Sequence, residues 1–123
     1  MSYAIEIAKK NVGADLVSAQ KTDIPICALI VKDNELISSA TNLIEKLKDA
    51  TAHAEILAIK EASRILGDWR LNSCVLYTTL EPCAMCAGAI VNSRESTLVF
   101  GAYDLTAGAS ETVLNLFGDL RIK

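Results

Sequence analysis

The chain has 123 residues, of which 51% are hydrophobic and 22% charged, and its formal net charge at pH 7 is −3. This length suits one domain over residues 1–123, because domains most often contain about 100 to 150 residues, and the composition excludes an intrinsically disordered protein. The acidic balance also excludes a chain whose whole surface attracts phosphates or an anionic membrane, so any contact with nucleic acid has to be local.

Residues 1–17 lack the basic start and the unbroken apolar core of a signal peptide. No apolar run approaches the roughly 18 residues of a membrane span. We therefore expect a cytoplasmic protein with no membrane partner. In that reducing compartment the four cysteines are expected to be free thiols or metal ligands rather than disulfides.

Hydrophobic periodicity predicts helices that alternate with short apolar strands. In chain order the expected elements are a helix over 3–18, a hairpin of strands 26–31 and 35–39 around Asp33-Asn34, a helical turn within 40–51, a helix over 52–66, a strand over 75–79, a helix from Pro82 to Ile90 or Val91, a strand over 97–100, and a short helix around 112–117. This order is typical of an α/β domain whose sheet is covered on both faces.

The helix over 52–66 has the clearest signal, with one apolar stripe made of Ala58, Ile59, Ala62, Ile65 and Leu66. Gly67 follows where helices often end in a left-handed glycine. Thr51 is the expected N-cap, which would place His53 in the first turn. Glu55 falls on the interior side of this helix, where a carboxylate is costly unless it is paired, hydrogen-bonded or protonated.

The stretch TLEPCAMCAGAI, residues 79–90, places Cys83 and Cys86 three apart. On a helix these two thiols share a face, and the positive N-terminal end of the helix favours thiolates, the form that binds metal. With His53, the one histidine of the sequence, they make a ligand set suited to zinc. Three protein ligands are typical of a catalytic zinc, which keeps a fourth position for water, whereas a structural zinc usually has four.

Cys27 and Cys74 are candidates for a fourth ligand, but each lies in or beside an apolar strand segment, where a free cysteine normally behaves as a small buried hydrophobe. Two plainer interpretations remain open at this point. The pair of cysteines is also consistent with a dithiol redox module, and the three ligands with a non-catalytic domain that holds a structural zinc. Glu55 argues against both, because neither requires a buried carboxylate beside the ligands.

The combination H-x-E followed by P-C-x-x-C is similar to the signature of the zinc-dependent nucleobase deaminases. Between Thr51 and Ala109 the chain most resembles the bacterial tRNA-specific adenosine deaminases, in the pieces TAHAEILAI, TLEPCAMCAGAIVNSR and LVFGAYD followed by GA. The resemblance implies a three-layer α/β/α cytidine deaminase-like fold, with a central mixed sheet of about five strands and helices on both faces.

The same resemblance implies one catalytic Zn²⁺ per subunit, held by His53, Cys83 and Cys86, with Glu55 as the catalytic proton shuttle. Zinc would activate a water molecule for attack on C6 of adenine. Glu55 would carry the water's proton to the adjacent ring nitrogen and later to the departing ammonia. The implied reaction is the conversion of the wobble adenosine of a tRNA anticodon to inosine.

Three further residues are expected at the substrate by the same resemblance. The backbone N–H of Ala54 would bond the attacking oxygen, Asn42 would hydrogen-bond the base edge or the sugar, and Asp104 would lie near the substrate strand. The alternatives are ordinary loop roles, with Asn42 bonded to its own backbone and Asp104 a surface carboxylate.

Several features depart from the family pattern. Thr106 stands where a lysine is usual, Cys27 replaces a common glycine, and the chain stops at LFGDLRIK where many members carry a longer basic helix. These differences leave the deamination chemistry intact but weaken the expected grip on the tRNA anticodon arm. A deaminase of a free base or nucleoside, of the guanine or cytosine type, is therefore the main alternative. A homodimer is also expected, partly from the small apolar run CAGAIV at 86–91.

Overall fold

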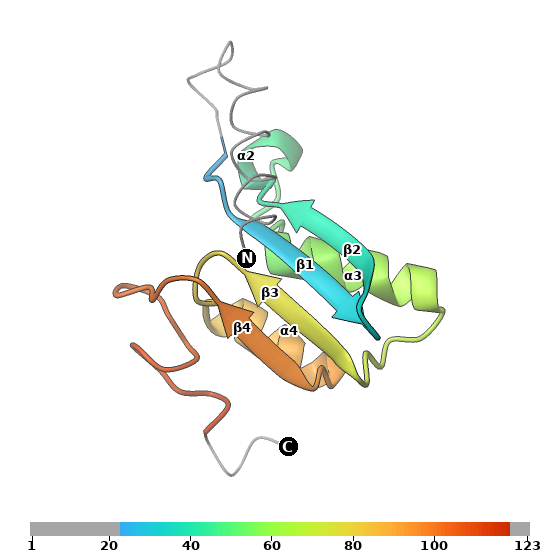
Figure 1. The fold of residues 1–123 in the computed structure, drawn as a ribbon. Coiled ribbons are helices and arrows are strands. Elements are labelled where there is room, and N and C mark those ends of the chain that lie inside the picture. Colours follow the sequence, from blue (N-terminus) through green and yellow to red (C-terminus); the bar gives the residue numbers. More distant parts are fainter. Residues whose placement is uncertain (1–22, 119–123) are drawn as a thin grey trace.

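The computed structural model describes residues 23–118 (Figure 1). The elements, in chain order, are β1 (Cys27–Lys32), β2 (Glu35–Thr41), α2 (Ile44–Leu47), α3 (Ala54–Leu66), β3 (Cys74–Thr78), α4 (Ala84–Ser93) and β4 (Thr97–Phe100). The helix predicted over 3–18 lies outside the described residues. Across the described part of the chain, no helix combines the length and the apolar character needed to cross a membrane.

The strands form one sheet in the order β2-β1-β3-β4. Strand β1 runs antiparallel to both of its neighbours, whereas β4 runs parallel to β3. The connection between the two parallel strands is α4, as the crossover of a βαβ unit requires. The sheet is mixed, as predicted, and the described residues contribute four of its strands rather than five.

The hairpin of β1 and β2 confirms the prediction at Asp33-Asn34. Both residues have positive φ, 51° at Asp33 and 62° at Asn34, which is the backbone of a two-residue type I′ turn. Asparagine and aspartate tolerate this left-handed region better than other residues with a side chain.

Helices α3 and α4 lie on the same face of the sheet (Figure 1) and share one core with it. Alanines form the buried stripe of α3, which brings its backbone close to the strands. The core cluster consists of Ala28, Ile30, Ala54, Ala58, Ala62, Leu71, Cys74, Leu76 and Ile90. A hydrogen bond of 2.8 Å from the Ser38 hydroxyl to the Ala58 carbonyl ties β2 to the middle of α3. Ile65, predicted in the apolar stripe, is instead 48% exposed.

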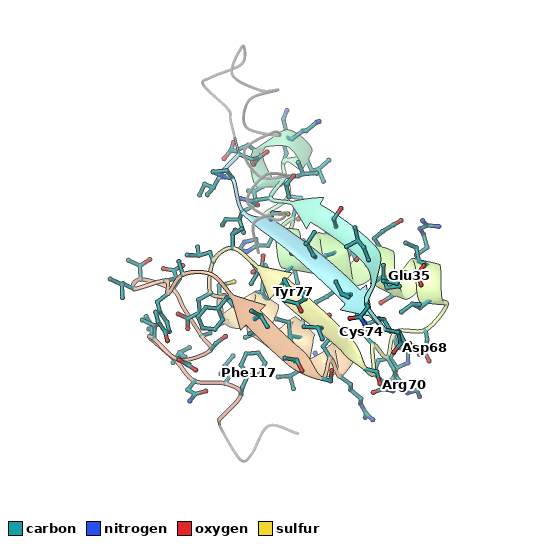
Figure 2. The ribbon with its side chains drawn as sticks, viewed as in Figure 1. Glu35, Asp68, Arg70, Cys74, Tyr77 and Phe117 are labelled. Carbon is teal, nitrogen blue, oxygen red and sulfur yellow. The ribbon has the colours of Figure 1, made fainter. Side chains whose placement is uncertain are left out.

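On the opposite face of the sheet, Cys27 and Leu29 are buried and Tyr77 packs against them. Figure 2 shows Tyr77 on this face, on the central part of the sheet. The sequence predicts helices on both faces of the sheet. Within residues 23–118, both α3 and α4 cover the same face.

Both predicted helix starts are wrong by a small shift. Helix α3 begins at Ala54 with His53 as its N-cap, while the Thr51 hydroxyl donates to Asp49 Oδ1 over 2.7 Å instead of capping the helix. Helix α4 has Cys83 as its N-cap and runs to Ser93. Proline at residue 82 therefore ends the extended segment and does not open the helix. Its fixed φ is compatible with both conformations, so proline alone does not locate the helix start.

The helix predicted around 112–117 is also wrong, because the described residues there form turns. The backbone donors that a helix would use are bound elsewhere. The N–H groups of Val113 and Leu114 both donate to the Gly108 carbonyl, and that of Leu116 donates to Ala109. The apolar spacing of this segment suits a helix, but these N–H groups bond to carbonyls five to seven residues back instead of four, so no helix forms.

We predict that Gly67→Ala lowers the free energy of unfolding by about 1 kcal/mol. Gly67 ends α3 with φ 68°, a conformation that strains any residue with a Cβ, although no atom lies within 4 Å of the added group. Gly88→Ala is the matched control: its Cβ also meets nothing within 4 Å, but its φ is not positive and it lies inside α4. This control is expected to raise stability by about 0.5 to 1 kcal/mol. Chemical denaturation measures both, and equal effects would contradict the left-handed cap.

Candidate active site

The N-termini of α3 and α4 bring three potential metal ligands together. His53 is the N-cap of α3, Cys83 is the N-cap of α4, and Cys86 lies in the first turn of α4. The Nδ1 atom of His53 is 3.7 Å from the Cys83 sulfur and 3.5 Å from the Cys86 sulfur. The structure therefore places all three predicted ligands at one point, with one ligand atom from each within 4.8 Å of the others.

These distances fit tetrahedral zinc. Bonds of about 2.3 Å to sulfur and about 2.0 to 2.1 Å to imidazole nitrogen, at tetrahedral angles, require a nitrogen-to-sulfur separation of about 3.5 Å. Among the described residues, no further His, Cys, Asp or Glu joins the group. The donor set is thus that of a zinc site with one position left for a non-protein ligand.

The other two cysteines lie apart from this group, as predicted. Cys27 and Cys74 are fully buried free thiols in β1 and β3, and Figure 2 shows Cys74 at the far end of β3, where the strand begins. Burial raises the pKa of the Cys27 thiol to about 11. A thiol that is so reluctant to ionise behaves as a small apolar side chain.

Cys83 has the opposite character. A hydrogen bond with the Cys86 side chain, and then the backbone N–H groups in the first turn of α4, lower the pKa of Cys83 to about 5. The pKa of Cys86 is raised, first by the hydrogen bond with Cys83 and then by burial. The pair therefore loses its first proton readily and its second with difficulty unless a cation compensates the charge.

Glu55 lies beside this group with only 4% of its surface exposed. Burial is the main reason that the pKa of its carboxyl is raised, and the nearby Cys83 also contributes. Two residues of a regular helix that lie two apart do not share a face. His53 escapes this limit because it precedes the helix with ψ 151°, so its side chain and that of Glu55 line the same cavity.

That cavity has a volume of about 220 Å³ and is mainly apolar. Its walls come from the segment before β1, from both helix starts, and from the loop after β4. The lining residues are Ile24, Ile26, Asn42, Ile44, His53, Ala54, Glu55, Leu80, Glu81, Cys83, Asp104 and Ala107. All three residues predicted at the substrate are therefore in the wall of one cavity that also contains two of the predicted ligands and the predicted proton shuttle.

Asn42 is 6% exposed, and its side-chain oxygen is buried without a hydrogen-bond partner among the described residues. An amide oxygen in this situation carries a desolvation cost of about 1 to 3 kcal/mol. Since Asn42 lines the cavity, a ligand with a hydrogen-bond donor can remove this cost. The alternative of an asparagine oxygen bonded to its own loop backbone does not occur here.

Asp104 also reaches the cavity wall, but its carboxylate serves the loop. Its Oδ1 accepts hydrogen bonds from the backbone N–H of Thr106 and of Ala107, over 3.0 and 3.1 Å, and from the Thr106 hydroxyl over 2.9 Å. The hydrogen bonds from Thr106 come first among the contacts that lower the pKa of Asp104. Thr106, the residue in place of the usual lysine, thus helps to fold the loop that carries Asp104.

Sequence reasoning missed Glu81, which is 2% exposed although it is charged. Burial alone would raise its pKa, but hydrogen bonds from the Thr112 side chain and from backbone N–H groups outweigh burial and lower the pKa of Glu81 to about 2. The available signal was a carboxylate next to Pro82, in the short segment between the strand predicted over 75–79 and the two cysteines.

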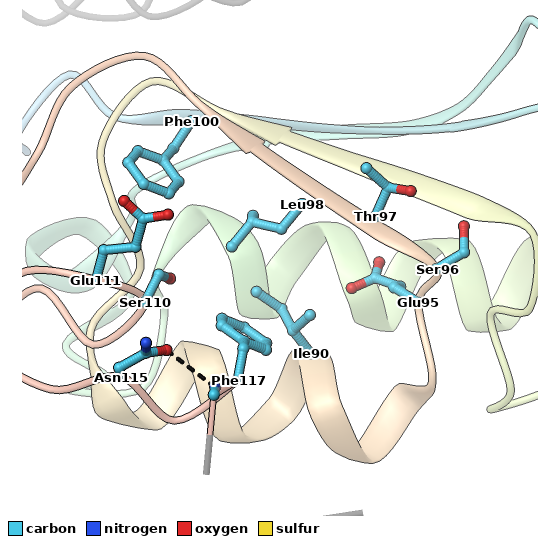
Figure 3. Close-up of a pocket in the computed structure, with 11 residues that line it drawn as sticks. Ile90, Glu95, Ser96, Thr97, Leu98, Phe100, Ser110, Glu111, Asn115 and Phe117 are labelled. Carbon is cyan, nitrogen blue, oxygen red and sulfur yellow. Dashed lines mark hydrogen bonds between the residues drawn. The ribbon is translucent and has the colours of Figure 1, made fainter. Parts of the chain in front are cut away.

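A second cavity, of about 430 Å³, lies between α4, β4 and the C-terminal loop. Figure 3 shows the Glu95 side chain directed into it, near Ile90 and Leu98. Both oxygens of Glu95 are buried and have no hydrogen-bond partner within residues 23–118. Burial raises the pKa of this carboxyl to about 8.

Comparison with known proteins identifies relatives over nearly the whole chain. A family model for MafB19-like deaminase matches residues 4–119. The tRNA-specific adenosine deaminase of Bacillus subtilis (strain 168) is 46% identical over 121 residues, which are 98% of this chain and 71% of that protein. The enzyme of the same name from Aquifex aeolicus (strain VF5) is 49% identical over 100 residues, 81% of this chain and 66% of that protein.

Solved structures give the same result. A structure from a study of A-to-I editing by tRNA:A34 deaminases superposes with a TM-score of 0.86 at 36% identity, covering 99% of this chain and 92% of that one. The guanine deaminase from Nitrosomonas europaea gives a TM-score of 0.73 at 31% identity, with coverage of 84% and 57%. These similarities establish the cytidine deaminase-like α/β fold.

We predict that Glu95→Gln stabilises the protein at alkaline pH. The pKa of Glu95 is raised from 4.5 to about 8 on folding, so the protonated acid is the form suited to the fold. The protonated Glu95 side chain contributes fully to the stability of the fold below about pH 4.5, and this contribution is lost as pH rises to about 8. At pH 9 the variant should be more stable by an amount on the order of 3 to 5 kcal/mol, and near pH 4.5 the two should be equal.

Denaturant unfolding at a series of pH values measures this difference. Glu111→Gln is the control, because Glu111 lines the same cavity but is exposed. A constant difference between wild type and Glu95→Gln at all pH values would contradict the prediction.

Proposed function

Because the chain belongs to the family of tRNA-specific adenosine deaminases, within the MafB19-like deaminases, we propose that it converts the wobble adenosine of a tRNA anticodon to inosine by zinc-dependent hydrolysis. The observation that supports this proposal is one cavity lined by His53, Glu55 and Cys83. The Asn42 oxygen lies in the same cavity wall and has no hydrogen-bond partner among residues 23–118. A cytoplasmic location is part of the same proposal.

His53, Cys83 and Cys86 are the proposed holders of one Zn²⁺ per chain, a role that their mutual distances support. When bound, zinc would act as a Lewis acid that lowers the pKa of a water molecule toward 7. The ionisable Cys83 suits such a role because the metal ligand is the thiolate.

Glu55 is the proposed general base and acid. Its buried position in the cavity wall keeps its affinity for a proton above that of an ordinary carboxylate. It would take one proton from the attacking water and deliver it to N1 of adenine as the C6–O bond forms. It would then return the second water proton to the amino group as the C6–N bond breaks and ammonia leaves.

The remaining cavity residues are proposed to hold the base. Ala54 is the first residue of α3, where the backbone N–H has no partner within the helix and is available to a ligand oxygen. The buried oxygen of Asn42 would accept a hydrogen bond from the base or the sugar. Asp104, folded into its loop by Thr106, would contact the substrate strand next to the flipped base.

The main alternative is a deaminase of a free base, such as guanine or cytosine. The acidic net charge of −3 and the absence of the usual lysine at Thr106 favour this reading. The lower TM-score of the guanine deaminase compared with that of the tRNA:A34 deaminase structure, 0.73 against 0.86, supports tRNA.

We predict that the zinc-loaded wild type forms inosine at the wobble position of a tRNA transcript, and that Glu55→Gln lowers kcat by about 10²- to 10⁴-fold without loss of zinc. Glu61→Gln is the matched control, because Glu61 is on the same helix but points to Arg64 on the surface. Single-turnover assays, with zinc measured by atomic emission, test both variants. Chelation should abolish activity and zinc addition should restore it.

The outcomes separate the hypotheses. Ammonia released only from guanine or cytosine would overturn the tRNA assignment but keep the deaminase chemistry. Protein purified without chelators that contains no zinc and forms a Cys83–Cys86 disulfide would indicate a redox module. Zinc that stays bound with no deamination of any substrate would indicate a structural site.

We also propose a homodimer. The CAGAIV run does not itself supply an exposed face, because its residues are buried or half-buried. Large exposed apolar side chains instead lie at the start of α4 and in the loop after β4: Met85 38%, Tyr103 59%, Leu105 80%, Val113 52%, Leu114 50% and Phe117 41%. We propose that these side chains contribute to the contact between the two chains, because protein contact surfaces often use exposed apolar side chains.

We predict that sedimentation velocity at micromolar concentration shows a single species of about twice the 13.2 kDa chain mass. The physical reason is that a monomer would leave these apolar side chains exposed to water, which is unfavourable. A monomer over the whole concentration range would contradict it.

A further inference from the structure

The carboxylate of Glu81 is the centre of a hydrogen-bond cluster that organises the loop over residues 102–112, called here the wall loop. Oε1 accepts a hydrogen bond of 3.1 Å from the N–H of Asp104. Oε2 accepts three more, from the N–H groups of Ser110, Glu111 and Thr112 at 3.0, 2.8 and 3.0 Å. The Thr112 hydroxyl also donates to Oε1. One buried side chain thus binds both halves of the wall loop.

Backbone contacts of the same segment support this arrangement. The N–H of Glu81 donates to the Ala102 carbonyl over 2.8 Å, and the Pro82 carbonyl accepts from the N–H of Ala109 over 2.9 Å. The wall loop is therefore fastened at its start, its middle and its end to residues 81 and 82. Four backbone donors that would otherwise be unsatisfied beside the cavity are bound by one carboxylate.

Gly108 shows how closely the wall loop approaches the carboxylate. A Cβ built on this glycine would lie 2.4 Å from Glu81 Oε1 and 2.6 Å from the Asp104 carbonyl oxygen. Both distances are too short for any side chain. The close fit requires glycine at this position.

Glu81 connects the metal-ligand group to the wall loop. Cys83, a proposed zinc ligand, follows it by two residues, and both line the 220 Å³ cavity. Asp104 and Ala107 of the wall loop line the same cavity. The hydrogen bonds of Glu81 therefore determine how far the wall loop lies from the residues proposed to hold zinc.

We propose that Glu81 is a positioning residue for substrate binding: it holds the wall loop, with Asp104, in register with the metal-ligand group. The proposal rests on the proposed function for the identity of the substrate. Because Glu81 acts through the wall loop, its loss should weaken binding of the flipped nucleoside and its flanking strand. The chemical step depends on Glu55 and the three ligands, none of which bonds to the Glu81 carboxylate among the described residues.

The central test compares Glu81→Gln with the wild type in steady-state deamination of a tRNA anticodon stem-loop. An amide of the same shape presents N–H donors to the N–H groups of the wall loop, so it breaks part of the cluster without creating a cavity. We expect KM to rise about tenfold or more while kcat stays within about threefold and the zinc content is unchanged. Glu111→Gln is the matched control, because Glu111 lies on the wall loop with an exposed side chain that accepts a hydrogen bond from Tyr103 and does not contact the Glu81 cluster through its side chain among the described residues.

Thr112→Val is a milder second variant in case Glu81→Gln does not fold. It removes one hydroxyl donor to the carboxylate and leaves all backbone donors in place. Its KM should rise less than that of Glu81→Gln, again with little change in kcat. A double-mutant cycle of Thr112→Val with Asp104→Ala should be non-additive in KM, because both changes act through the same loop.

Amide hydrogen exchange gives a readout that does not depend on catalysis. The N–H groups of Asp104 and of residues 110–112 should exchange faster in Glu81→Gln and in Thr112→Val than in the wild type, whereas the amides of β1 should not change. Unchanged exchange at these amides overturns the positioning role whether or not the enzyme acts on tRNA. Faster exchange with an unchanged KM, or a fall in kcat alone, also overturns it. If the wild type does not deaminate tRNA but the variants still exchange these amides faster than the wild type, the proposed function is overturned. The role of Glu81 is then confined to holding the wall loop.

Discussion

The structure depends on the convergence of two helix N-termini over one end of the sheet. Helices α3 and α4 pack on the same face of the sheet and each begins near the same point, so their N-caps, His53 and Cys83, come within 3.7 Å of each other. Small side chains along α3 permit this close packing. The positive ends of both helix dipoles then favour anionic groups at that point, which is where the thiols and Glu55 lie.

This convergence creates an electrostatic problem that a metal ion would solve. Two thiols and a carboxylate in one largely buried group cannot all be ionised in the absence of a cation, because like charges and desolvation both oppose it. The raised pKa values of Glu55 and Cys86 express this conflict, and the lowered pKa of Cys83 shows where the first charge settles. A divalent cation would let both cysteines ionise and would leave Glu55 free to exchange a proton.

Glu81 and Glu95 show how the environment decides the role of a buried acid. Four backbone N–H groups and one hydroxyl surround the Glu81 carboxylate, so the ionised form is stable and organises a loop. The Glu95 carboxylate has no hydrogen-bond partner in the described part of the chain and faces the side chains of a second cavity (Figure 3), so its burial favours the neutral form. Nothing in the local sequence around either residue distinguishes these two outcomes.

The sequence by itself determined what depends on residues close together in the chain. The turn at Asp33-Asn34, the end of α3 at Gly67 and the mixed α/β order all follow from local backbone preferences and periodicity, and the motif spacing identified His53, Glu55, Cys83 and Cys86. Only the tertiary structure decided what depends on partners far away. In the structure both helices begin directly after a predicted ligand, with His53 and Cys83 as their N-caps, and residues 112–117 form turns instead of a helix. The tertiary structure also placed the Asn42 oxygen in the cavity wall, without a hydrogen-bond partner among the described residues, and gave Glu81 its donors from residues 104 to 112. The physical reason is that the hydrogen-bond partner of a buried polar group can lie anywhere in the sequence. Local backbone preferences carry no information about which residue becomes that partner in the folded chain.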